Sequence, residues 1–433
     1  MPYRLHPHTR LRTERESVLW FHRGTAETLE LDLEGIHTLI HLLQGKRLWT
    51  PRGWRFFQYL WAKGFLQKQK ANPEEVTWLQ ALREQSLTLA APLRSRRAPE
   101  VLQLSLTDAC QQSCSGCFFS NPDPQTPNRY MSPKTFQRVL KDALSQQVFQ
   151  MALGGGEPLM HPKLLDYVQA ITQAGIVANL TSNGALLTPN KALALKAAGL
   201  GQIQFSLNGL SPEVHHQTRP HHDKVLQAIG MAQKAGLRWG LNVLVTPQHL
   251  QHNAAALQDL FQFAQAQGAA MVNLIRPKAA QSDPHWLAQH QPDATAHRHL
   301  QQLLTHWQRK ANFALMTDTS YTFLREGSIA QWLAAGVSGC SAGRRMLSVQ
   351  VDGTYSPCSH LPERFQHHGS LQKVWQQGPG VEAFRQLEDT LEGACGQCAY
   401  KSVCRGCRAV VLSEGRSFFG ADHQCPKPLS ISS

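Results

Sequence analysis

The chain has 433 residues, of which 42% are hydrophobic and 17% are charged, as is typical of globular protein with two or three domains. No stretch approaches about eighteen uninterrupted apolar residues, and the first residues lack a signal-peptide pattern, so we expect neither a membrane span nor secretion. The formal net charge of +13 suits nucleic acid or an acidic peptide as partner. The basic residues form only small groups, which we interpret as solvated surface: Arg94, Arg96, Arg97, Arg344 and Arg345.

Residues 1–93 are predicted to form a separate N-terminal domain. Two strands of a hairpin are expected at Val18–Phe21 and Thr28–Leu31, and two amphipathic helices that end at glycine are expected at 33–45 and 50–64. A hairpin followed by helices and a wing resembles a winged helix, so DNA binding is one candidate role for this domain.

Residues 98–320 alternate between strand-like and helix-like segments. Several of the helical segments begin with Ser, Thr or His beside Pro and end at Gly. Six strands are predicted, at Val101–Leu106, Val148–Leu153, Ile176–Leu180, Gln202–Leu207, Trp239–Val245 and Met271–Ile275. Connections of this kind place the strands parallel with the helices outside, so we expect an α/β barrel built from six βα units.

Three cysteines follow the first predicted strand. Cys110, Cys114 and Cys117 have the spacing CxxxCxxC, and three thiolates this close can hold three corners of an iron–sulfur cube while the fourth iron stays open. Zinc knuckles usually show CxxC pairs, and ferredoxin runs supply a fourth cysteine, whereas the next cysteine here is Cys340. The alternatives are a zinc site completed by a distant histidine, or unrelated buried thiols.

A glycine-rich loop follows the second predicted strand, with the residues Gly155, Gly156, Glu157 and Pro158. Glycines let the backbone approach a ligand closely, and either the acidic side chain or exposed carbonyls can accept hydrogen bonds from an ammonium group. Alone, such a pair of glycines is more often only a turn.

In this order, CxxxCxxC and GGEP resemble the signatures of the radical S-adenosylmethionine (SAM) enzymes. The resemblance implies a partial (β/α)6 barrel of the TIM type and a 4Fe–4S cluster whose open iron chelates the methionine part of SAM. One electron then yields a 5′-deoxyadenosyl radical, which abstracts hydrogen from the substrate. The catalytic residues beyond the cluster are not predicted.

The same resemblance implies further SAM-binding residues at the ends of later strands. Ser206 and Arg219 would contact the methionine carboxylate, and Asn183 follows the third strand where the cosubstrate would lie. Asn208 replaces the aspartate that is usual in the family. The alternative for each residue is an ordinary turn or capping role.

The position before the third cysteine is also unusual. Family members often carry an aromatic residue there, packed near the adenine, but this chain has Gly116. Phe118 or Phe119 are the local aromatic alternatives.

Residues 335–433 contain the other seven cysteines and resemble the SPASM extension of this family. Seven thiols are too many for one four-ligand site and one fewer than two sites require. The resemblance implies two auxiliary 4Fe–4S clusters, an outer one on Cys395, Cys398, Cys404 and Cys425 and an inner one on Cys340, Cys358 and Cys407. The fourth inner ligand could be water, a non-cysteine side chain or the substrate. One or two zinc-ribbon sites are the alternative.

The N-terminal domain also looks like a PqqD-like recognition element, which captures the leader of a precursor peptide as an added strand. With the barrel and the cysteine-rich domain, it points to a cytoplasmic maturase of ribosomally made peptides that receives electrons from a flavodoxin-type or ferredoxin-type donor. We expect an oxidative C–C or C–S crosslink. The alternatives are a radical SAM enzyme acting on RNA or on a folded protein such as a sulfatase, a peptide epimerase, and a metal-stabilised DNA-binding protein without enzymatic activity.

Overall fold

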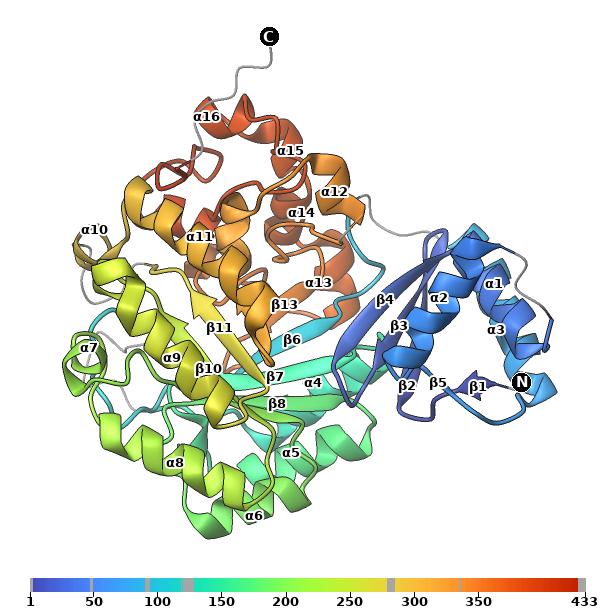
Figure 1. Ribbon diagram of the computed structural model, residues 1–433, viewed down its shortest axis with the longest axis horizontal. Helices are drawn as coiled ribbons and strands as arrows, with labels where there is room; N and C mark the ends of the chain where they lie inside the picture. Colours follow the sequence, from blue (N-terminus) through green and yellow to red (C-terminus); the bar gives the residue numbers. More distant parts are fainter. Residues whose placement is uncertain are drawn as a thin grey trace. The chain divides into compact units, whose positions relative to one another are not determined.

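The computed structural model describes residues 3–46, 50–89, 94–117, 119, 128–278, 285–334 and 336–426. The chain divides into two compact units (Figure 1). Unit 1 consists of Met1–Glu100 with Ser145–Phe149, and unit 2 consists of Val101–Leu144 with Gln150–Ser433. Within the described ranges, no helix has the length and apolar character needed to cross a membrane.

Unit 1 is built on an antiparallel sheet of three strands, β2 (Thr9–Glu14), β3 (Ser17–His22) and β4 (Glu27–Asp32), and a small pair, β1 (Arg4–Leu5) with β5 (Leu66–Gln67). Its helices are α1 (Leu33–Leu43), α2 (Pro51–Ala62) and α3 (Pro73–Thr88). Asp32, Thr50 and Asn72 cap the three helices through their side chains, which explains where each helix begins. The predicted hairpin and the two predicted helices are therefore confirmed.

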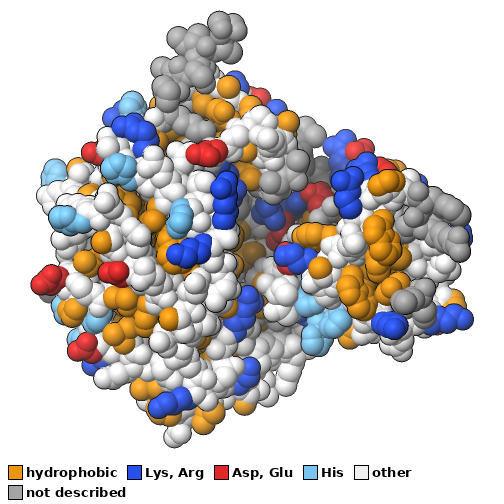
Figure 2. Space-filling model, viewed as in Figure 1, with side chains coloured by type: hydrophobic (Ala, Val, Ile, Leu, Met, Phe, Trp, Pro, Cys, Tyr) orange, Lys and Arg blue, Asp and Glu red, His pale blue; other side chains and the backbone are white. Residues whose placement is uncertain are grey.

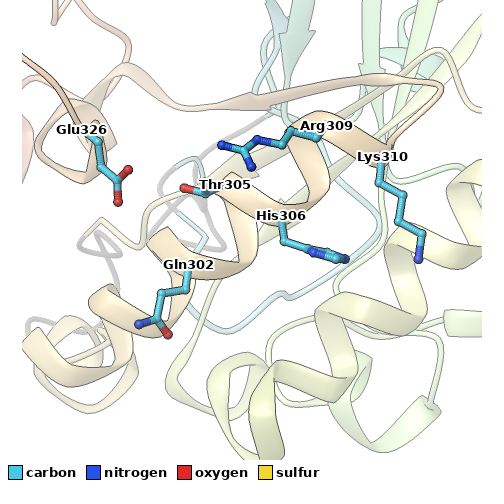
Figure 3. Close-up of a pocket in the computed structure, with 6 residues that line it drawn as sticks. All are labelled: Gln302, Thr305, His306, Arg309, Lys310 and Glu326. Carbon is cyan, nitrogen blue, oxygen red and sulfur yellow. The ribbon is translucent and has the colours of Figure 1, made fainter.

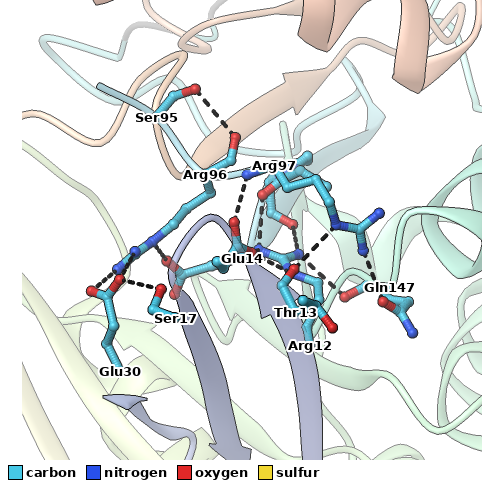
Figure 4. A network of polar contacts seen from close by, with 12 residues as sticks. Arg12, Thr13, Glu14, Ser17, Glu30, Ser95, Arg96, Arg97 and Gln147 are labelled. Atoms are coloured by element: carbon cyan, nitrogen blue, oxygen red, sulfur yellow. Dashed lines mark hydrogen bonds and ion pairs between the residues drawn. The ribbon is translucent and has the colours of Figure 1, made fainter. Parts of the chain in front are cut away.

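A polar network inside unit 1 holds β2 against residues 96–100 (Figure 4). Arg12 is fully buried, forms an ion pair with Glu14 at 2.8 Å, and donates to the carbonyls of Ala98 and Pro99. Arg96 forms ion pairs with Glu30 and Glu100. The interpretation of the basic groups as solvated surface is thus wrong for Arg96.

Unit 2 contains one sheet of nine strands in the order β12-β11-β10-β9-β8-β7-β6-β13-β14. All neighbours pair in parallel except β13 and β14. The strands are β6 (Val101–Thr107), β7 (Gln150–Gly155), β8 (Val177–Ser182), β9 (Gln202–Ser206), β10 (Trp239–Leu244), β11 (Met271–Ile275), β12 (Ala314–Thr317), β13 (Met346–Val349) and β14 (Tyr355–Ser356). All six predicted strands are confirmed, and β12, β13 and β14 were not predicted.

Helices cover the outer face of this sheet (Figure 1). They are α4 (Pro133–Ser145), α5 (Leu164–Gln173), α6 (Pro189–Ala197), α8 (His222–Lys234), α9 (Ala255–Ala266) and α11 (Ala294–Lys310), with the shorter α7 (Pro212–His216), α10 (Trp286–His290) and α12 (Ile329–Ala334) in the loops. The cysteine-rich segment adds α13 (Leu371–Gln377), α14 (Pro379–Arg385), α15 (Leu387–Thr390), α16 (Gly393–Gly396) and α17 (Arg408–Ser413). This strand-and-helix arrangement is the predicted α/β fold.

We expect the substitution Arg12→Ala to destabilise unit 1 by about 3–5 kcal/mol, because it leaves the buried Glu14 carboxylate without its partner. Hydrogen–deuterium exchange of the full chain should then show faster exchange of the β2 and β3 amides. The control is Arg52→Ala, which breaks an exposed pair with Glu34 and should cost no more than about 1 kcal/mol. Equal protection of β2 in the two variants would contradict this account of the network.

Candidate active site at the carboxyl ends of the strands

Because the strands from β6 to β12 are parallel, their carboxyl ends meet at one edge of the sheet. The cluster loop, which we define as residues 108–117, leaves β6 at this edge. The GGEP loop follows β7, and Asn183 follows β8. Ser206 is the last residue of β9, where it is half-buried and lies opposite Asn242 of β10. The structure thus brings the predicted residues of the first four strands together at this edge.

The two glycines of the GGEP loop allow that loop to touch the start of the cluster loop. A Cβ atom on Gly155 would lie 2.3 Å from the carbonyl oxygen of Thr107, and one on Gly156 would lie 2.2 Å from that of Ala109. Gly155 also has a φ of +120°, which favours glycine. The amides of Gly156 and Glu157 donate to these same carbonyls at 2.7 and 2.8 Å. The glycines are therefore required for contact between the two backbones.

The carboxylate of Glu157 is fully buried and joins β7 to β8. Its Oε1 accepts from the Ser182 hydroxyl at 2.8 Å and from the Leu159 amide at 3.0 Å, and its Oε2 accepts from the Asn183 amide at 2.8 Å. Burial raises the pKa of Glu157, and these hydrogen bonds oppose the shift. Since its acceptors are engaged inside the protein, the carbonyls of the loop are the better candidates to receive an ammonium group.

Asn183 connects the end of β8 to the cluster loop. Its Nδ2 lies 3.8 Å from the sulfur of Cys110, and its Oδ1 accepts from the Gln111 side chain and from the Ala185 amide, both at 3.0 Å. Asn183 is buried. Its side chain therefore orients the first cysteine.

Arg219 lies in the loop after β9, beside the cluster loop. Burial raises the pKa of the Cys114 thiol, and the positive charge of Arg219 opposes that shift. Its Nε atom is buried and has no hydrogen-bond partner among the described residues. Arg219 also lines a cavity of about 730 Å³, together with Ser113 and Ser115 of the cluster loop. A cavity of this size suits a small molecule, and the guanidinium is available for a carboxylate.

Asn208 has a structural role. Its Nδ2 donates to Thr218 at 2.7 Å, its Oδ1 accepts from the Leu244 amide at 3.0 Å, and its own amide donates to His215 Nδ1 at 3.2 Å. Burial lowers the pKa of His215 to about 4, so this imidazole accepts as a neutral ring. The network fixes the loop that carries Arg219.

A second hollow, of about 530 Å³, lies on α11 (Figure 3) and contains none of the predicted site residues. It is lined by Gln302, Thr305, His306, Arg309, Lys310 and Glu326.

An aromatic ring from a distant part of the sequence covers Gly116. A Cβ atom on Gly116 would lie 2.2 Å from two carbons of the Trp286 ring, and Gly116 has a φ of +74°. Trp286 was not predicted as a site residue. The only sign of it in the sequence is Gly116, a glycine at a position that is usually aromatic in the family. Phe118, one of the two local alternatives, lies outside the described residues.

The three cysteines of the cluster loop are near neighbours. Burial raises the pKa of Cys110 to about 11, and the thiols of Cys114 and Cys117 add to the shift. No group of three or more His, Cys, Asp or Glu side chains in the described ranges is placed to hold a single metal ion. The ligands of an iron–sulfur cube bind separate irons, so close thiols on a half-exposed loop, next to the cationic side chain of Arg219, suit such a cluster.

Three of the seven C-terminal cysteines form an inner group. Burial raises the pKa of Cys358 to about 12, and the neighbouring thiols of Cys340 and Cys407 add to the shift. His360 lies beside them, with its Nδ1 3.6 Å from the Cys358 sulfur.

The other four C-terminal cysteines form a second group. Burial raises the pKa of Cys404 to about 12, with added effects of Cys425 and Cys395. Burial also raises the pKa of Cys395, and its neighbour Cys398 adds to that shift. That each of the two groups holds an iron–sulfur cluster stays a prediction.

A buried ion pair ties both groups to the sheet. Arg276, which follows β11, donates to the two carboxylate oxygens of Asp422 at 2.7 and 2.8 Å. Asp422 also accepts from the Cys407 amide at 2.9 Å, and its own amide lies 3.4 Å from the Cys395 sulfur. Breaking such a pair leaves an unpaired buried charge, so it holds the cysteine-rich segment firmly at the strand ends.

Comparison with known proteins agrees with this geometry. Residues 104–261 match the profile of the radical SAM superfamily. The chain carries a radical SAM domain. The prediction of an enzyme that uses SAM and a 4Fe–4S cluster is therefore confirmed, and the alternative of a DNA-binding protein without enzymatic activity is wrong.

The chain is also similar to curated relatives and to a solved structure over more of its length. The chain is 25% identical to AdoMet-dependent heme synthase of Methanosarcina barkeri, over 76% of this chain and 96% of that protein. It is 29% identical to mycofactocin maturase of Mycolicibacterium smegmatis, over 77% and 84%. The crystal structure of Streptococcus suis SuiB bound to SAM matches with a TM-score of 0.72 and 19% identity, and covers 97% of this chain and 99% of that one.

We expect Arg219→Ala to weaken SAM binding by about tenfold or more, because a charge-assisted hydrogen bond contributes roughly 1.5–3 kcal/mol. Arg219→Lys should bind with intermediate affinity, since an ammonium group keeps the charge but loses the fork of donors. Equilibrium dialysis of the anaerobically reconstituted protein measures this. Lys224→Ala is the control, because Lys224 lines the same cavity and should change the affinity by less than about threefold. Unchanged binding in Arg219→Ala would show that this residue does not contact SAM.

Proposed function

We propose that the protein is a maturase of ribosomally made peptides that installs an oxidative crosslink. The observation that supports this most strongly is the extent of the likeness to SuiB. SuiB bound to its precursor peptide SuiA matches 98% of this chain with a TM-score of 0.69. A fold shared with a peptide-binding enzyme along nearly the whole chain favours a peptide substrate.

Unit 1 has the features expected of a peptide-recognition domain. Its three-stranded sheet has two outer strands, β2 and β4, and an added peptide strand pairs with an outer strand of this kind. Hydrophobic side chains also gather on the face that carries α2 (Figure 2). Trp54 and Trp61 of α2 are 53% and 45% exposed, lie on the same face of the helix and both contact Phe57, and we call them the aromatic patch. Exposed apolar patches typically mark interaction sites.

The radical site and the cysteine-rich segment would share the oxidation. Cys110, Cys114 and Cys117 would hold a cluster that, with SAM and one electron from a flavodoxin-type or ferredoxin-type donor, supplies a 5′-deoxyadenosyl radical and releases methionine. Forming one C–C or C–S crosslink removes two hydrogens from the peptide. One leaves as a hydrogen atom to that radical, and the other leaves as a proton and an electron. The two cysteine groups would hold clusters able to accept this electron, and a flavodoxin-type or ferredoxin-type protein would be its external carrier.

The fourth inner ligand would be a non-cysteine group. His360 is a candidate, because a neutral imidazole beside Cys358 is a common type of metal ligand.

A short reading frame beside the gene is the place to look for a precursor peptide. We expect such a peptide to lose two hydrogens when it is co-expressed with this protein, which mass spectrometry detects. The double variant Trp54→Ala and Trp61→Ala should reduce the yield of modified peptide by about tenfold or more, because aromatic anchors dominate binding energy. Its SAM cleavage without peptide should stay unchanged. The control is Trp78→Ala, an exposed tryptophan on α3 outside the aromatic patch.

Other results would point to the alternatives. An inverted stereocentre without mass change would indicate an epimerase. No binding of any precursor peptide by a protein that cleaves SAM would contradict the proposal and favour RNA or a folded protein as substrate.

A further inference from the structure

Helix α10 lies between two cysteine-bearing segments that are far apart in the sequence. It has only five residues, Trp286–His290, and a helix of this length is not stable by itself in water. Its first two residues, Trp286 and Leu287, are buried, at 2% and 3% exposure. Contacts with the rest of unit 2 must therefore hold α10 in place.

The first contact is with the cluster loop. The Trp286 ring lies in space that any Cβ atom at position 116 would enter, and its Nε1 donates to the Ser115 hydroxyl at 2.7 Å. Ser115 and Gly116 stand between the second and third cysteines of the loop. Trp286 thus fixes the part of the loop that sets the separation of Cys114 and Cys117.

The ring of Trp286 is itself held in one orientation. The His290 ring stacks on it with centroids 4.4 Å apart and planes 5° apart. The Nδ1 of His290 lies 2.8 Å from the Trp286 carbonyl, which can only accept, so Nδ1 carries the proton and donates. A ring that is stacked on His290 and hydrogen-bonded to Ser115 is a rigid support for the cluster loop.

The second contact is with the inner cysteine group. Leu287 packs in one buried cluster with Cys407, Ala409 and Val410. Cys407 precedes α17, and its backbone amide donates to Asp422. Trp286 and Leu287 are adjacent residues of α10. Trp286 therefore contacts the cluster loop, and Leu287 contacts the start of α17.

We propose that α10 fixes the position of the cluster loop relative to the inner cysteine group, and that Trp286 is the positioning residue for the loop. For Cys407 the inference rests on the proposed function, but for the cluster loop it rests only on the radical SAM domain. SAM chelates the open iron, so its affinity depends on how the loop orients the cluster, and a displacement of about 1 Å can change such an interaction by a large factor.

The test compares full-length, anaerobically reconstituted variants without any peptide, so it is independent of the substrate. Trp286→Ala should weaken SAM binding in equilibrium dialysis by about tenfold or more and should change the shift that SAM causes in the electron paramagnetic resonance spectrum of the reduced cluster. Trp286→Phe keeps a ring against Gly116 and should stay within about threefold of the wild type.

A double-mutant cycle separates positioning from general destabilisation. Gly116→Ala should weaken SAM binding strongly, because its Cβ displaces the ring. In the Trp286→Ala background the same substitution should add little beyond the strain of the positive φ. Wild-type affinity and spectrum in Trp286→Ala, or additive effects of the two substitutions, would overturn the proposal. If Trp286→Ala does not fold, Gly116→Ala and Trp286→Phe still test the proposal. Equal losses of SAM affinity in these two variants would also overturn it.

Discussion

The buried carboxylate of Glu157 is the interaction on which the arrangement of the site depends. A charge without solvent must be matched by donors, and here the donors come from its own loop and from the end of β8. The carboxylate therefore fixes the ends of two neighbouring strands relative to each other. Asn183, one of these donors, then contacts the first cysteine of the cluster loop. Gly155 and Gly156 bring the same two loops into backbone contact.

A buried ion pair at the end of β11 likewise fixes a neighbouring segment. Arg276 extends from the end of β11 and holds Asp422, which in turn contacts residues of both C-terminal cysteine groups. The strand ends thus position the radical site through a carboxylate and the cysteine-rich segment through an ion pair. Helix α10 connects the two regions directly. The proposed electron transfer would require fixed separations, and rigid contacts of this kind would provide them.

Much of the fold could be predicted from the sequence because its signals are local. The strands of the barrel are short apolar runs between capped helices. The spacing of the cysteines indicates which of them are expected to bind a cluster. Strand β2 was missed because Arg10 and Arg12 obscure its pattern, although the Arg12 side chain is buried by pairing with Glu14. The role of Glu157 could not be predicted, since a ligand-binding and a structural carboxylate look alike in a motif. Trp286 was missed because nothing local links it to Gly116.

The central claim is that the radical formed at the cluster loop abstracts hydrogen from a peptide. The most direct measurement uses a precursor peptide deuterated at the residues that become crosslinked, with the reconstituted protein and SAM, followed by mass analysis of the 5′-deoxyadenosine. The account predicts 5′-deoxyadenosine that carries deuterium and a peptide that has lost it. Unlabelled 5′-deoxyadenosine alongside crosslinked peptide, or crosslinking without any 5′-deoxyadenosine, would contradict it.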